Sequence, residues 1–125
     1  MSGAGRLAAL ARLATLKKEA NQMALSAAGA RRAAIEARLR ALDQAETEAW
    51  CAAERSEDAG TLVAQQAFAR LMAARRTVLG GELERATEDC QTARAAAARS
   101  FGQSTVLDRL LAEARIETSM RRRDR

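Results

Sequence analysis

The apolar residues of the first half recur at the three- and four-residue spacing of one helix face. The stripe opens with Leu7, Leu10, Leu13 and Leu16. Its later members drift in phase, which indicates an imperfect heptad and only slight supercoiling. They are Met23, Ala27, Ala28, Ala34, Ile35, Leu39, Leu42, Ala45 and Ala49. The pattern predicts a first helix over about residues 4–58.

A second stripe with the same spacing runs through the other half, and predicts a second helix over about residues 62–120. Its members are Phe68, Leu71, Val78, Leu79, Leu83, Ala86, Cys90, Ala93, Ala97, Phe101, Leu107, Leu110 and Leu111. Between the two stripes we expect a turn at about residues 59–61, with Gly60 in the left-handed conformation after the first helix and Thr61 capping the second. Gly80–Gly81 is a rival turn, but it would leave the first third of the chain without a partner. We therefore interpret it as a kink.

A turn near residue 59 fixes which residues face each other, because facing numbers in an antiparallel hairpin have a constant sum, here about 118. This register pairs Leu39 with Leu79, and Ile35 with Leu83. The leucines of the two chain ends also pair, Leu7 with Leu111 and Leu10 near Leu107. The acidic stretch before the turn faces basic residues, with Glu48 by Arg70 and Asp43 by Arg75. The predicted fold is all-α: a single long antiparallel two-helix coiled-coil hairpin over residues 1–125.

Composition supports this fold. The 125 residues include no Pro and no Tyr, and only 2% are aromatic, so bulky core residues are scarce and a single seam suits the chain better than a globular core. The N-terminal residues lack the layout of a signal peptide, and no apolar run reaches membrane-spanning length. We expect a soluble, cytoplasmic protein without direct membrane insertion. The two cysteines fit a reducing compartment, and the hairpin would hold Cys51 and Cys90 too far apart for a disulfide.

Candidate chemistry is sparse. With no His, neither His-based acid–base catalysis nor His metal ligation is available. Cys51 and Cys90 lack a metal-binding spacing, and Gly3–Gly5 lacks the Lys and Ser/Thr of a phosphate-binding loop. A two-helix hairpin also offers no concave pocket that excludes water. We expect a protein that is not an enzyme and has no cofactor or metal.

Interaction with partners remains, and two regions stand out. Near the turn, the candidate partner-binding residues are Glu46, Trp50, Phe68 and Met72. Trp50 lies one position off the Ala49 stripe, so it is either an exposed anchor or a cap on the hairpin core. Leu71 is assigned to the seam and Met72 to the surface. At the open end, where both termini meet, basic residues accompany the leucines. The candidates there are Leu7, Leu10, Leu107, Arg109, Leu111 and Arg115.

These residues resemble a known family. The N-terminal run Arg6-Leu7-x-x-Leu10-x-x-Leu13-x-x-Leu16-Lys17-Lys18-Glu19 is similar to that of the bacterial flagellar FliJ proteins. The C-terminal Phe101-x-x-x-x-Val106-Leu107-Asp108-x-Leu110, followed by an Arg-rich end, also resembles them. Length and the two-halves layout are similar over essentially the whole chain, and the YscO-type stalk proteins of virulence type III secretion would look much the same.

The resemblance implies an antiparallel coiled coil that acts as the central stalk of a hexameric export ATPase. It also implies contact with the membrane export gate and handling of export chaperones, in the cytoplasm and at the inner membrane through these partners. The open end would insert into the ATPase ring, and the region of Trp50 and Phe68 would face the gate; the reverse assignment is the alternative.

Two other functions are consistent with the residues. The basic open end and the run Arg121–Arg125 could bind nucleic acid through phosphate contacts, although the chain lacks interleaved aromatics and any recognition motif. A structural homodimer could instead form if Ala stripes joined two hairpins into a four-helix bundle.

Overall fold

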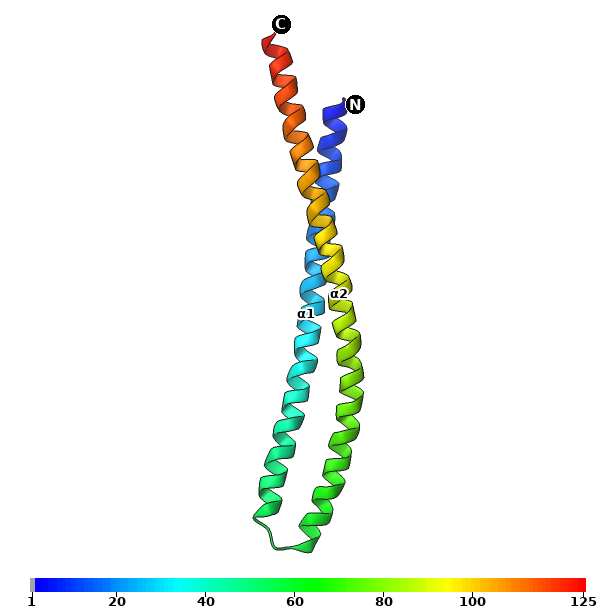
Figure 1. Cartoon of the computed structure of the whole chain (residues 1–125), viewed down its shortest axis with the longest axis vertical. Coiled ribbons are helices and arrows are strands. Elements are labelled where there is room, and N and C mark those ends of the chain that lie inside the picture. The colour runs from blue at the N-terminus through cyan, green and yellow to red at the C-terminus, as the bar shows by residue number, and fades with distance from the viewer. Residues whose placement is uncertain (1) are drawn as a thin grey trace. The chain divides into compact units, whose positions relative to one another are not determined.

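The computed structural model describes residues 2–125 and contains two α-helices, α1 over Gly3–Glu54 and α2 over Ala59–Arg123 (Figure 1). No strand occurs in this range. The two long helices pack against each other in opposite directions, which confirms the predicted all-α helical hairpin. Met1, the first residue of the predicted hairpin, lies outside the described residues.

Local sequence favours both helices. Ala, Leu, Arg and Glu lose little conformational entropy in a helix, and together they make up most of the chain. The Ser2 hydroxyl accepts a hydrogen bond from the Gly5 amide at 3.1 Å, and so caps the first turn of α1. At the other end, three arginines in the last turn of α2 complement the negative end of its dipole.

The connection between the helices lies earlier than the sequence predicts. α1 ends at Glu54, and α2 begins at Ala59. The Asp58 carboxylate accepts the Gly60 amide hydrogen at 3.0 Å, so Asp58 is the N-cap of α2, and Thr61 already lies inside the helix. No glycine within residues 2–125 has a positive φ. The predictions of a left-handed Gly60 and of a Thr61 cap were therefore wrong. The Asp58 carboxylate, two residues before Gly60, caps α2, so the helix begins before Gly60.

Gly80 and Gly81 do not interrupt α2, which is helical from Ala59 to Arg123. A Cβ atom added at either glycine would meet nothing within 4 Å. A break at this pair is excluded, because α2 stays helical through it. Including two glycines costs the helix less free energy than ending it between two seam contacts would.

Contacts within the chain group into two units. Unit 1 contains residues 2–27 and Gln91–Arg125, and unit 2 contains Ala28–Cys90. Each unit is a pair of antiparallel helical segments with its own seam.

The seam of unit 1 consists mainly of small residues at alternating three- and four-residue steps. Ala11 and Ala97 are buried, as are Ser100 and Ser104. Small side chains allow two helices to approach at the short end of the usual range of about 8–10 Å. The seam positions are Ala4, Leu7, Ala11, Ala14, Lys18, Asn21 and Leu25 on α1, and Ala93, Ala97, Ser100, Ser104, Leu107, Leu111 and Ala114 on α2.

The seam of unit 2 contains larger side chains. Ile35, Met72, Ala86 and Cys90 are its buried apolar residues. Half-buried leucines lie beside them, and the buried Gln65 lies toward the turn. The seam positions are Ala28, Arg32, Ile35, Leu39, Leu42, Glu46, Ala49 and Ala53 on α1, and Gln65, Phe68, Met72, Arg76, Leu79, Leu83, Ala86 and Cys90 on α2.

Of the four leucines predicted to form the stripe at the start of α1, only Leu7 lies in the seam. Leu10, Leu13 and Leu16 are exposed, and the alanines at Ala11 and Ala14 take the seam instead. The predicted drift in phase has the same cause, since Met23, Ala27 and Ala34 are exposed and the true α1 seam keeps regular heptad steps within each unit. On α2 the exposed stripe members are Leu71, Val78, Phe101 and Leu110.

The register agrees closely with the predicted one. Asn21 donates to the Ala96 carbonyl at 3.4 Å and also bonds Ser100 in unit 1. In unit 2, Arg76 pairs with Asp43 at 2.8 Å, where Arg75 was expected. The partner on α2 is thus shifted by one residue, and no ion pair joins Glu48 to Arg70 within residues 2–125.

Replacing Ile35 by Ala should lower the free energy of unfolding by about 2–4 kcal/mol, because Ile35 is 5% exposed and its removal opens a cavity. Leu16→Ala is the matched control on α1, because Leu16 is 61% exposed, and it should change stability by less than about 0.5 kcal/mol. Urea denaturation followed by circular dichroism measures both. Equal losses would mean that Leu16 is packed as closely as Ile35.

The Asp58 cap is tested at two neighbouring positions. Asp58→Ala should cost about 1 kcal/mol of stability, since it leaves the Gly60 amide without its acceptor, whereas Asp58→Asn should be nearly neutral. Gly60→Ala should stabilise the chain by up to about 1 kcal/mol, because Gly60 is helical. Thermal melts of the three variants are sufficient. Destabilisation by Gly60→Ala would instead support a left-handed backbone at this position.

Candidate partner-binding surfaces

The two units differ strongly in charge. Unit 1 has twelve Lys and Arg residues against five Asp and Glu, a formal charge of +7. Unit 2 has nine against eleven, a formal charge of −2. Unit 1 is therefore the surface suited to an acidic partner, since summed charge steers association.

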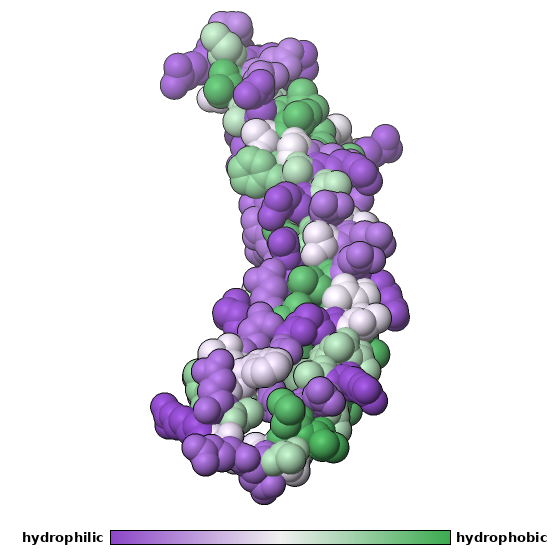
Figure 2. All heavy atoms as spheres, turned by 60° about the horizontal axis from the view of Figure 1, so that its bottom comes forward, coloured by the Kyte–Doolittle hydropathy of each residue, from purple (hydrophilic) through white to green (hydrophobic). Residues whose placement is uncertain are grey.

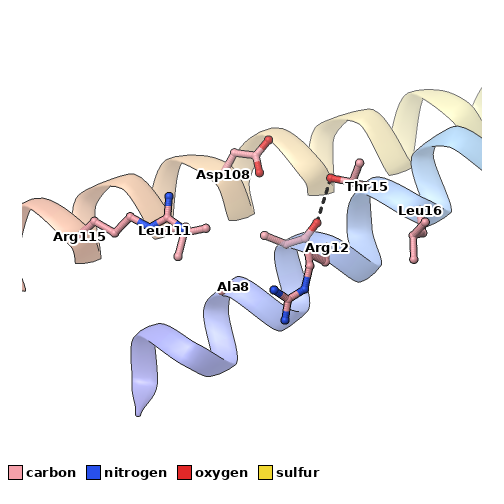
Figure 3. Close-up of a pocket in the computed structure, with 8 residues that line it drawn as sticks. Ala8, Arg12, Thr15, Leu16, Asp108, Leu111 and Arg115 are labelled. Atoms are coloured by element: carbon pink, nitrogen blue, oxygen red, sulfur yellow. Dashed lines mark hydrogen bonds between the residues drawn. The ribbon is translucent and has the colours of Figure 1, made fainter. Parts of the chain in front are cut away.

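On one flank of unit 1, the two helices form a shallow groove of about 420 Å³ (Figure 3). α1 contributes Ala8, Arg12, Thr15 and Leu16, and α2 contributes Asp108, Leu111 and Arg115. The Thr15 hydroxyl donates back to the Ala11 carbonyl at 3.0 Å, so it is not free to bind a ligand. Arginines on both sides make the groove suitable for an acidic protein segment.

The other flank of unit 1 has a second groove of about 480 Å³. It exists because several of its residues have little or no side chain, among them Ala14, Ala98 and Gly102. Val106 and Leu107 close one end, and Arg99 and Gln103 line its wall.

The six predicted open-end residues divide into two sets. Leu7, Leu107 and Leu111 are half-buried on the seam, where they hold the helices together. The exposed members, which can contact a partner without disturbing the seam, are Leu10, Arg109 and Arg115.

A polar layer crosses the interior of unit 1. Asn21 bonds Ser100, and both Ser100 and Ser104 are 2% exposed. The Ser104 hydroxyl has no hydrogen-bond partner among the described residues. Buried polar side chains cost stability but fix the register of a coiled coil. Lys18 lies beside this layer with its Nζ 5.8 Å from the centre of the Phe101 ring, a cation–π contact.

Near the turn, Trp50 is exposed, at 46% of its surface, and Phe68 is half-buried. The structure thus favours the anchor interpretation of Trp50. Met72, predicted to be a surface residue, is buried at 3%, and Leu71, predicted to be in the seam, is 49% exposed. These two assignments were reversed, because the seam passes through Phe68 and Met72 and so excludes Leu71.

Glu46, the fourth residue predicted near the turn, is already paired. Its carboxylate accepts from the Arg76 guanidinium, which also bonds Asp43. The hydrogen bond to Glu46, assisted by that to Asp43, raises the pKa of Arg76 further above its usual range. This cluster tethers α2 to α1 within unit 2, so Glu46 is a structural residue here rather than a free contact for a partner.

Sequence reasoning missed some exposed apolar residues of unit 2. Leu62 and Val63 follow the Asp58 cap and are both exposed, and Leu71 and Val78 continue along α2. Figure 2 shows hydrophobic residues gathered near the turn among hydrophilic ones. The adjacent apolar residues at 62 and 63 could have indicated this patch, since only one of two neighbours can face a seam.

Of the two cysteines, Cys90 is buried and Cys51 is exposed, and both are free thiols.

Within residues 2–125 no helix is long and apolar enough to cross a membrane. In the same range no three His, Cys, Asp or Glu residues come together as possible metal ligands. Comparisons with protein-family models, with curated proteins and with solved structures found no match to this chain.

Trp50, as the single tryptophan, reports on the surface near the turn. Its fluorescence should be red-shifted and readily quenched by acrylamide, since 46% of the residue is exposed. Addition of a partner that binds there should shift the emission to the blue. Emission already blue-shifted and protected in the free chain would mean that Trp50 belongs to the core.

Proposed function

We propose that this chain is a non-catalytic coiled-coil component of a bacterial flagellar or type III protein export apparatus. In this proposal it is the central stalk of the hexameric export ATPase and couples it to the export gate and to export chaperones. It works in the cytoplasm, at the inner membrane through these partners. The proposal starts from the resemblance of the N- and C-terminal leucine-rich segments to the FliJ proteins.

The observation that carries the proposal is the charge of unit 1. A stalk enters a ring and contacts the lining of that ring on all sides. The helical pair of unit 1, with a formal charge of +7, suits a ring with an acidic lining. Arg109 and Arg115 are exposed there, whereas the seam leucines keep the two helices together during rotation. We assign unit 1 to the ATPase ring on this basis.

The surface near the turn suits a different partner. Trp50 is an exposed aromatic on a unit with a formal charge of −2. Leu62 and Val63 of the same unit are also exposed. Exposed aromatic anchors are frequent energetic centres of protein interfaces. We assign this surface to the export gate, with chaperones as further clients.

The assignment of the two ends is tested by ATP hydrolysis. The purified chain should stimulate the export ATPase, and Arg109→Glu with Arg115→Glu should raise the concentration needed for half-maximal stimulation by roughly tenfold or more. Arg38→Glu with Arg40→Glu, the same charge change on exposed residues of unit 2, should leave stimulation intact. Trp50→Ala should also leave it intact and weaken only binding to the gate.

The opposite result would contradict the proposal: stimulation unaffected by the changes at Arg109 and Arg115 but lost in Trp50→Ala. Nucleic acid is the alternative binding partner for the basic unit 1. A gel shift across a salt series separates the two, because phosphate binding must be strong at low salt and fall steeply as salt rises.

A further inference from the structure

Four large apolar side chains of unit 1 are exposed without a partner in the chain. Leu10 and Leu13 are 50% and 62% exposed on α1, and Val106 and Leu110 are 55% and 43% exposed on α2. Contiguous exposed apolar residues of this size mark interaction surfaces on soluble helices.

These four residues share one flank of the helix pair. Ala8 and Thr15 of α1 lie on the same flank as Asp108 and Arg115 of α2, because they line one groove. Positions on the other side of each seam must then share the opposite flank, and by helical spacing they include Leu10, Leu13, Leu110 and Val106. The second groove agrees with this arrangement for α2, since Val106 lines it together with Ala14 of the α1 seam. We call the four residues the apolar flank.

Members of the apolar flank lie at similar heights. Asn21 contacts Ser100 in unit 1, and this register, followed toward the termini, places Leu10 within one residue of the height of Leu110 and Leu13 within two residues of that of Val106. Farther along the same flank, Arg6 lies within two residues of the height of Glu113, and both are exposed. Neither forms an ion pair within residues 2–125.

We propose that the apolar flank is the docking site for a second copy of this chain, and that the two hairpins lie parallel about a two-fold axis along their length. This axis sets α1 of one copy against α2 of the other, with Leu10 against the second copy's Leu110 and Leu13 against its Val106. It also sets Arg6 against Glu113 of the second copy. Two-fold interfaces pair the same patch with itself, and here the patch is self-complementary in polarity and charge.

Charge selects this orientation over the reverse one. If the second copy ran in the opposite direction, Leu10 would meet Leu13 of the partner copy, but Arg6 would then meet Lys17. A like-charge pair opposes that arrangement, whereas the parallel one pairs opposite charges.

The inference is independent of the export role, because it concerns only the flank of unit 1. It differs from a bundle joined by alanine stripes, since the alanines are occupied in the seam of each hairpin. A dimer would cover Leu10, so export-ring insertion and self-association would compete for one surface.

Sedimentation velocity of the full chain over roughly 1–100 µM is the primary test. The expected mass is that of two chains at high concentration. Leu13→Asp should raise the dimer dissociation constant by at least about tenfold. Leu16→Asp is the matched control: Leu16 is 61% exposed, three residues from Leu13, and lies off the apolar flank, so this variant should remain dimeric. Circular dichroism should give the same helix content for both.

Charge reversal tests the orientation. Arg6→Glu and Glu113→Arg should each weaken the dimer, and the double variant should restore it to within about threefold of the original affinity. A chain that stays monomeric at the highest concentration would overturn the proposal. So would equal effects of Leu13→Asp and Leu16→Asp, and failure of the double reversal to rescue would overturn the parallel arrangement.

Discussion

Close contact between small side chains along the seam is the constraint on which the structure depends. In unit 1 the buried positions are Ala11, Ala97, Ser100 and Ser104, none of which contributes more than a little apolar area. The helices can gain from such residues only by approaching closely, and a close approach leaves little room for larger side chains beside them. Several large apolar residues of this unit, among them Leu10, Leu13 and Leu110, therefore lie outside the seam, where they are available to other molecules.

This displacement separates stability from recognition. Within unit 2, Ile35 and Met72 fill the seam and Arg76 ties α2 to two acidic residues of α1. Within unit 1, stability comes from a thinner seam whose register is fixed by Asn21 and Ser100, and the surface carries both the excess positive charge and exposed leucines. A partner can thus bind unit 1 without competing for the contacts that hold its helices together. The proposed self-association and the proposed binding to an export ring would both depend on this property.

The sequence predicted the helical hairpin and came close to its register, because composition, the lack of proline and the spacing of apolar residues all favour two antiparallel helices. It failed at the phase of the seam. Leucine outranks alanine in any hydrophobic count, so the stripe was drawn through Leu10 and Leu13, although the packing depends on size rather than hydrophobicity alone. An error of phase also reversed the assignments of Leu71 and Met72, since the seam contains Met72 and not Leu71. The turn was misplaced because glycine was weighted above the Asp58 carboxylate, whose capping bond depends on three-dimensional geometry. The sequence alone does not decide whether Trp50 is exposed, because a shift of the seam by one residue would bury it.

Disulfide trapping across the polar layer of unit 1 tests the seam most directly. With Cys51 and Cys90 replaced by Ser and Ala, Asn21→Cys combined with Ser100→Cys should form an intrachain disulfide rapidly under mild oxidation, because the two side chains are in contact. Asn21→Cys combined with Phe101→Cys should oxidise much more slowly, since Phe101 is exposed and off the seam. Peptide mapping identifies the intrachain product. Equal rates for the two pairs, or a faster 21–101 bridge, would contradict the alanine and serine seam.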